Sequence, residues 1–325
     1  MAHHDQAHHQ AHPYHLVDPS PWPAVGAASL FCLAIGMAMF MHQKTGGAII
    51  LALGFVGVLY TMFAWWRDVV KEAVVEKKHT QEVSRGLRAG MALFITSEVL
   101  FFAAFFWAFF NASTLPKLPL PLGDSWAILH GVWPPAGIHP FDPWHLPFLN
   151  TLILLLSGTT VTWAHWCILH NDNKGTIKAL WYTVILGLLF TACQAYEYSH
   201  AAFGFKDGVY ASTFFMATGF HGFHVIVGTI FLAVCLGRAY KGHFTPQQHL
   251  GFEFAAWYWH FVDVVWLFLF VCVYGDFANK LMPAFTAIFT GTNILIAFLL
   301  SLVLAGYGAV KMIRGGKFDK VAHHH

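Results

Sequence analysis

Charged residues are scarce in this chain of 325 residues: Asp, Glu, Lys and Arg together make up 10% of it, and 57% of the residues are hydrophobic. A soluble globular domain usually carries about 25% charged residues. The formal net charge is only +2 when histidine is counted as neutral. With no dense basic face to neutralise phosphates, the composition argues against nucleic acid as a partner.

Cysteine pairs and targeting signals are also lacking. The five cysteines lie singly in apolar runs, with no CxxC or CxxxC spacing, and are predicted to be buried small hydrophobes: Cys32, Cys167, Cys193, Cys235 and Cys272. The first 21 residues contain no Lys or Arg, and no apolar run begins before Leu16. These residues are therefore not expected to form a cleavable signal peptide or an Arg-rich transit peptide.

Long apolar runs, in contrast, are abundant. Eight are long enough to cross a hydrocarbon core about 30 Å thick as helices, because lipid cannot satisfy free backbone groups. The predicted fold is an all-α polytopic membrane bundle, with a His-rich tail at 1–21, a seven-helix domain at 22–275 and an extension with one further span at 276–325. The spans are predicted at 22–42, 46–66, 87–110, 147–170, 177–203, 208–238, 252–275 and 284–311.

The basic residues predict the orientation of these spans. With eight spans, fourteen Lys and Arg fall on one side, six of them between Arg67 and Arg88, and four fall on the other. By the positive-inside rule, both termini are expected in the cytoplasm, or in the matrix of an organelle. The outer loop 111–146, rich in Pro, Trp and Gly, is expected to be an ordered interfacial cap.

The histidine-rich ends carry weaker signals. The N-terminal stretch MAHHDQAHHQAHPYH could bind metal weakly, but its composition favours a solvated arm. The run His323–His325 is either native or a cloning remnant, and the sequence does not distinguish these origins.

Ionisable residues near mid-membrane are the candidates for function, since each costs about 2.5–3.5 kcal/mol to insert. Glu98, His224 and Asp263 lie eleven to fourteen residues from the inner ends of their predicted spans. His221 shares a helix face with His224, and His260 shares one with Asp263. These His and Asp residues could hold iron or zinc. A buried polar cluster is favoured, because no further His completes a ligand set for haem or copper. Its His and Asp residues would join two helices, and Glu98 is counted as a further member of it.

Glu98 supports two interpretations equally. It lies in ITSEVLFF, with no basic residue within one turn on its own helix. It is either a neutral carboxyl that is hydrogen-bonded to a neighbouring helix, or part of a lipid-headgroup or proton-linked site.

Seven motifs, in order along the chain, resemble subunit III of the haem-copper cytochrome c oxidases. They are PSPWP (19–23), WWRDV (65–69), GLRAGMALFITSEVLFF (86–102), NTLILLLSG (150–158), VTWAH (161–165), DGVYASTFFMATGFHGFHVIVGTIF (207–231) and GFEFAAWYWHFVDVVWLFLF (251–270). The resemblance covers about Pro19 to Gly275, and the remaining fifty or so residues depart from the family pattern.

The resemblance implies seven helices in a V-shaped arrangement with lipid in the cleft. It implies a subunit without a redox centre of its own, which stabilises subunit I and supports its proton uptake within a proton-pumping oxidase. Haem and copper belong to the partner subunits, and the cofactors of this chain are structural phospholipids only. The family's lipid-contact residues fall on Trp66, Lys71, Glu72, His79, Glu98, His224, Arg238 and Lys241.

The expected partners are subunit I, subunit II, phospholipid and, as a further option, a supercomplex with the cytochrome c reductase. The expected location is a bacterial inner membrane, with the mitochondrial inner membrane as the alternative. Two other functions remain open: subunit III of a quinol oxidase, since subunit II selects the electron donor, and a free-standing transporter or proton channel with Glu98 and Asp263 as a relay. The eighth span could replace a small separate subunit or contact a respiratory partner complex.

Overall fold

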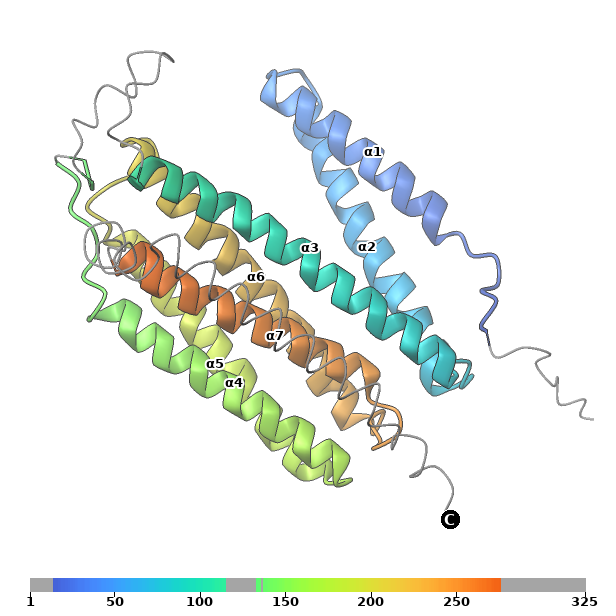
Figure 1. The fold of residues 1–325 in the computed structure, drawn as a ribbon. Coiled ribbons are helices and arrows are strands. Elements are labelled where there is room, and N and C mark those ends of the chain that lie inside the picture. Colours follow the sequence, from blue (N-terminus) through green and yellow to red (C-terminus); the bar gives the residue numbers. More distant parts are fainter. Residues whose placement is uncertain (1–13, 115–132, 136, 276–325) are drawn as a thin grey trace, which may run out of the picture. The chain divides into compact units, whose positions relative to one another are not determined.

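The computed structural model describes residues 14–114, 133–135 and 137–275. This part of the chain is all-helical, and seven of its helices are long and apolar enough to cross a membrane. The helices are α1 (Trp22–Met41), α2 (Gly47–Val74), α3 (Gln81–Thr114), α4 (Leu146–Leu169), α5 (Asn173–Ser199), α6 (Val209–Tyr240) and α7 (Leu250–Leu269), which continues as the short π-helix η2 (Phe270–Tyr274) (Figure 1). The all-α membrane fold is therefore confirmed. The predicted span 284–311, the N-terminal tail up to residue 13 and most of the predicted cap at 111–146 lie outside the described residues.

The largest differences from the predicted boundaries lie between α2 and α3. The predicted spans end at residue 66 and resume at 87, but α2 continues to Val74 and α3 begins at Gln81. The predicted spans were bounded by hydropathy alone, so each one ended where the first charged residues occur. The intervening Arg, Lys, Glu and Ala residues are good helix formers, so both helices run on past the apolar segment. The predicted loop of 67–88 therefore shortens to residues 75–80.

Local signals account for several helix ends. Gly46 has a φ of +80°, which lets the chain turn sharply between α1 and α2. The Asp172 carboxylate accepts a hydrogen bond from the Gly175 N–H (2.9 Å), as an N-cap of α5 does.

The chain forms two compact units. The first comprises residues up to Val99 together with Thr160–Thr183 and Ile230–Tyr258, and the second comprises Leu100–Thr159, Val184–Thr229 and the residues from Trp259 onward. Each unit has its own packing.

In the first unit, glycines hold α1 and α2 together as a hairpin (Figure 1). A Cβ built on Gly36 would lie 2.5 Å from Leu51 Cα, and one built on Gly54 would lie 2.6 Å from Leu33 Cα. Ordinary carbon contacts are about 3.5–4.0 Å, so only glycine permits this approach of the two backbones.

In the second unit, two buried tryptophans of α7 bond to hydroxyls of α4. Trp259 Nε1 donates to Ser157 Oγ (3.0 Å), and Trp266 Nε1 donates to Thr151 Oγ1 (2.9 Å). Phe190 of α5 packs edge-on against Trp266 at 4.8 Å between ring centroids. These contacts make α7 the centre of this unit's core, because its buried face touches both α4 and α5.

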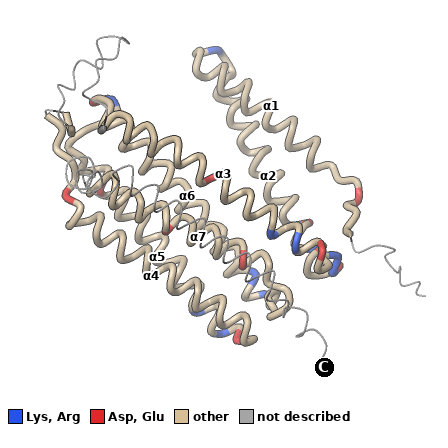
Figure 2. The backbone as a smooth tube through the Cα atoms, in the orientation of Figure 1, with Lys and Arg blue, Asp and Glu red and all other residues tan. Residues whose placement is uncertain are grey.

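Charged side chains gather near the helix ends, and the central stretches are almost free of them (Figure 2). Among the described residues, the cations of the predicted inner side belong to the first unit: Arg67, Lys71, Lys77, Lys78, Arg85, Arg88, Lys174, Lys178, Arg238 and Lys241. The distribution is typical of helices whose ends meet the polar interface of a bilayer.

Candidate functional site at the end of α2

Residues 15–22, which precede and begin α1, lie against the charged end of α2 and form a strap across it. Trp22 Nε1 donates to Asp68 Oδ2 (2.7 Å). His15 Nε2 lies 3.4 Å from Glu72 Oε2, an ion-pair distance without hydrogen-bond geometry. The strap is thus fixed at two points, both in the last two turns of α2.

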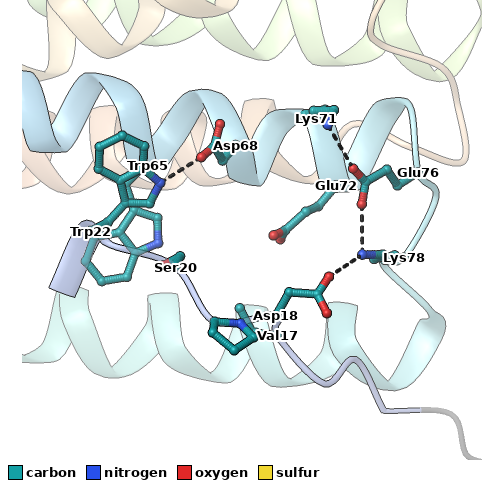
Figure 3. Close-up of a pocket in the computed structure, with 11 residues that line it drawn as sticks. Val17, Asp18, Ser20, Trp22, Trp65, Asp68, Lys71, Glu72, Glu76 and Lys78 are labelled. Atoms are coloured by element: carbon teal, nitrogen blue, oxygen red, sulfur yellow. Dashed lines mark hydrogen bonds and ion pairs between the residues drawn. The ribbon is translucent and has the colours of Figure 1, made fainter. Parts of the chain in front are cut away.

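Beside the strap, four charged groups alternate in sign (Figure 3). Glu76 Oε1 pairs with Lys71 (3.3 Å), Glu76 Oε2 pairs with Lys78 (2.9 Å), and Lys78 also reaches Asp18 Oδ2 (3.3 Å). Hydrogen bonds from Lys78 and then Lys71 hold the pKa of Glu76 below its ordinary value. The hydrogen bonds with Glu76 and then Asp18 raise the pKa of Lys78. The network links the strap to the 75–80 loop.

A pocket of about 230 Å³ opens among these groups. Its lining combines two indole rings with carboxylates and ammonium groups, which suits a ligand with a polar head and an apolar body. The lining residues are Val17, Asp18, Pro19, Ser20, Trp22, Trp65, Asp68, Lys71, Glu72, Glu76 and Lys78 (Figure 3).

The structure places four of the predicted lipid residues in this region, with different surroundings. Lys71 and Glu72 line the pocket. Trp66 does not; its side chain is 62% exposed, and its neighbour Trp65 lines the pocket instead. His79 lies in the 75–80 loop, 6.4 Å from the His15 ring. Burial lowers the pKa of His79, an effect that Glu72 opposes and His15 reinforces, so His79 is neutral at physiological pH.

The predicted lipid residues Arg238 and Lys241 lie at the end of α6 and just beyond it. The Arg238 guanidinium sits over the Phe244 ring, with Cζ 4.7 Å from the centroid, and its Nε is buried without a hydrogen-bond partner. Lys241 is exposed. Burial, followed by the charges of Arg238 and Lys241, lowers the pKa of the nearby His243.

Glu98 lies midway along α3 and is partly exposed. One turn earlier, Phe94 stacks on Tyr258 of α7 at 6.4 Å between ring centroids. Near the start of the same two helices, Arg88 forms a two-pronged ion pair with Glu253, with Nε–Oε1 and Nη2–Oε2 both 2.9 Å. Sequence reasoning did not find this pair, because 165 residues separate its partners.

The predicted buried histidines have separate hydrogen-bond partners. His221 packs beside Phe190 and Trp266, and its Nε2 lies 3.2 Å from the Val262 carbonyl of α7. His224 Nδ1 lies 2.7 Å from the Phe220 carbonyl of its own helix. The rings therefore make local packing contacts within the second unit.

His260 and Asp263, also predicted to lie together, do so on α7. His260 Nδ1 is 3.7 Å from Asp263 Oδ2, and the Asp263 carboxylate fills the space above Gly158 of α4. The Asp263 Oδ1 atom is buried without a hydrogen-bond partner. The imidazole of His260, in contrast, is 47% exposed at mid-span.

Sequence reasoning missed a second buried acid. Glu197 of α5 accepts hydrogen bonds from Tyr274 Oη (2.6 Å) and Gln194 Nε2 (3.3 Å), and its other oxygen is buried without a partner. The sequence carried a signal for it, since Glu197 lies inside the predicted span 177–203, but Glu197 is close to the C-terminal end of α5, where charged residues are common.

Seven apolar spans with charges confined mainly to their ends define a polytopic helical membrane protein. The family model for "Cytochrome c oxidase subunit III" matches residues 12–276. A protein of Arabidopsis thaliana named "Cytochrome c oxidase subunit 3" is 56% identical over 265 residues, which are 82% of this chain and 97% of that protein. A Rickettsia felis protein named "Probable cytochrome c oxidase subunit 3" is 56% identical over 82% of this chain and 95% of its own length.

The chain therefore belongs to the cytochrome c oxidase subunit III family. The motif-based resemblance is confirmed. The matched region ends at residue 276, one residue beyond the predicted end of the seven-helix domain.

Proposed function

We propose that this chain is a non-catalytic core subunit that holds phospholipid at the inner interface, stabilises subunit I and supports its proton uptake. Family membership makes the chain a subunit of cytochrome c oxidase and an inner-membrane protein. The names of its relatives favour that oxidase over the quinol oxidase and over a free-standing transporter. Subunits I and II are the proposed partners, with a reductase supercomplex as a further option.

The observation that carries the lipid proposal is the end of α2. Lys71 and Glu72 line a pocket there together with the indole of Trp65, and the neighbouring residue Trp66 is exposed. Cationic and aromatic side chains at headgroup depth suit a phospholipid, with the ammonium near the phosphate and the acyl chains along apolar helix faces. Arg238 and Lys241 supply further positive charge at the end of α6.

The absence of a redox centre in this chain remains a proposal, as does the location of haem and copper in the partner subunits. The absence of a redox centre is supported by the partners of three histidines: His221 bonds to the Val262 carbonyl, His224 bonds to the Phe220 carbonyl, and His260 lies beside Asp263. A haem or copper site needs several nitrogen donors that point to one centre. These donors do not fit that requirement.

The topology is proposed from the basic residues and from the length of the chain. The basic residues at the end of α2 and the start of α3 favour the cytoplasm of a bacterial cell, or the matrix, for this end of the helices. Seven spans alone would leave Gly275 outside. We propose that 284–311 crosses the membrane as an eighth helix and returns the C-terminus to the inner side; these residues lie outside both the described part and the family match.

The lipid proposal is tested with the intact oxidase complex. Lys71→Met should reduce the phospholipid retained after detergent washing, as measured by mass spectrometry, because it removes the charge that pairs with the phosphate. Haem content should stay unchanged. Lys206→Met, an exposed lysine in the α5–α6 loop, is the matched control. Equal lipid retention in the two variants would contradict the lipid site, and loss of haem with Lys71→Met would contradict the non-catalytic assignment.

A further inference from the structure

Three polar side chains near the start of α4 and the end of α5 carry buried atoms that have no hydrogen-bond partner among the described residues. These atoms are Nδ2 and Oδ1 of Asn150 on α4, and Oε1 of Gln194 and Oε2 of Glu197 on α5. Asn150 is 0% exposed, Gln194 is 5% exposed and Glu197 is 3% exposed. Buried polar atoms in native proteins almost always have a partner, because a group that leaves water without gaining one is destabilising.

The two α5 side chains are fixed by Tyr274, the last residue of η2. Tyr274 Oη donates to Glu197 Oε1 (2.6 Å), and Gln194 Nε2 donates both to Tyr274 Oη (3.3 Å) and to Glu197 Oε1 (3.3 Å). These bonds use the phenol hydroxyl, the Gln194 amide nitrogen and one carboxylate oxygen. The two oxygens left over, Gln194 Oε1 and Glu197 Oε2, both need a donor.

Asn150 lies at the same level of the core as Gln194. Trp259 of α7 bonds to Ser157 of α4, and its ring atom Cη2 would lie 2.9 Å from a Cβ built on Gly187 of α5. The short turn between α4 and α5 makes these helices antiparallel, so Asn150 and Gln194 both lie seven residues, or about two turns, from these contacts in the same direction. A seven-residue step also returns to nearly the same helix face.

The next tryptophan of α7 connects this level with Tyr274. Trp266, seven residues after Trp259, donates to Thr151, the residue that follows Asn150. The ring centroids of Trp266 and Tyr274 are 5.7 Å apart. Asn150 and the hydrogen bonds around Tyr274 therefore belong to one region of the core of the second unit.

We propose that this region binds a buried water molecule, which bridges Asn150 of α4 to Gln194 and Glu197 of α5. Water has two O–H donors, which match the two acceptors Gln194 Oε1 and Glu197 Oε2, and its lone pairs accept from Asn150 Nδ2. One molecule thus supplies three of the four missing bonds, which is the usual number for a buried water. The described residues contain no group of three His, Cys, Asp or Glu that could hold a metal ion.

The test is radiolytic footprinting of the intact oxidase complex, in which brief X-ray exposure converts bound water to hydroxyl radicals that modify the nearest side chains. Mass spectrometry of the peptides should show that Tyr274 is hydroxylated several times faster than Tyr210. Tyr210 is the matched control, because both tyrosines are buried in the second unit (4% and 3% exposed) and Tyr210 packs among Phe203 and Phe214. Equal rates for the two tyrosines would overturn the proposal.

Two variants test the role of Asn150. Asn150→Leu keeps the size of the side chain but removes the donor to the water, so it should slow Tyr274 hydroxylation to the rate of Tyr210. Thr229→Val is the control, because its buried hydroxyl bonds within its own helix to the Val225 carbonyl. Haem content shows separately whether each complex has assembled. An unchanged Tyr274 rate in Asn150→Leu would overturn the bridge.

The same measurement separates water from a bound cation. Wild-type complexes are compared in choline chloride, sodium chloride and potassium chloride, and the hydroxylation rate of Tyr274 should be the same in all three salts. A slower rate in sodium or potassium chloride alone would show that a cation displaces the water, and would overturn the proposal.

Discussion

Replacing Gly54 with alanine should loosen the α1–α2 hairpin. The new methyl carbon would lie 2.6 Å from Leu33 Cα and 2.9 Å from the Cys32 carbonyl carbon. Contact at about 3.5–4.0 Å requires the helices to separate by roughly 1 Å. Overpacking of this kind costs about 1–3 kcal/mol, and alanine regains at most about 1 kcal/mol of helix propensity. The expected net loss is about 1–2 kcal/mol of hairpin stability.

Gly36→Ala acts on the same contact, since Gly36 meets Leu51 while Gly54 meets Leu33. Once one new methyl group has separated the two helices, the second methyl group requires less additional separation. The double variant should therefore cost less than the sum of the single variants. Full additivity would show that the two glycines act independently.

The assay is the heat-induced dissociation of this subunit from the intact complex, in which Gly54→Ala should lower the midpoint by a few degrees. Gly90→Ala on α3 is the matched control, because its new Cβ meets nothing within 4 Å in the described part of the chain. If Gly54→Ala and Gly90→Ala behaved alike, the close approach of α1 and α2 would not determine hairpin stability.

Four further changes have defined outcomes. Glu98→Gln should leave haem content and initial oxygen reduction near wild type and alter only proton uptake or inactivation during turnover; loss of initial activity in an assembled complex would give Glu98 a catalytic role. Trp266→Phe should lower the dissociation midpoint, because it leaves a cavity and an unfilled acceptor at Thr151, which together cost about 1–3 kcal/mol. Trp107→Phe, at an exposed position, should leave the midpoint unchanged. The pKa values of His79 and Glu76 are both lowered, so both groups stabilise the strap at high pH and this stabilisation is lost as the pH falls. A spin label at Ser20→Cys should therefore gain mobility as the pH falls below 6.5 and again below 4.5. Glu76→Gln should abolish the second step, and a pH-independent spectrum would refute the network. Truncation after Gly275 should leave seven helices that still assemble with subunit I, and failure to assemble would show that the extension is essential.

The sequence by itself determined the class, the seven described spans and the family. Hydrophobic runs longer than a bilayer needs leave the chain no alternative to helices, because backbone groups in lipid must bond within their own segment. The family followed from ungapped motifs such as GLRAGMALFITSEVLFF, which are read directly from the chain. The spacing of His260 and Asp263 on one helix also placed them side by side, since neighbours three apart share a face.

Only the tertiary structure decided which residues from different helices meet. Helical periodicity gives a residue its face, but it does not say which helix that face touches. The Arg88–Glu253 ion pair, the bond from His221 to Val262 and the bond from Tyr274 to Glu197 join segments that are far apart in the chain. A hydrophobic run also ends at the first charged residue, whereas a helix can continue past it. For this reason α2 extends to Val74 and brings Lys71 and Glu72 beside the strap.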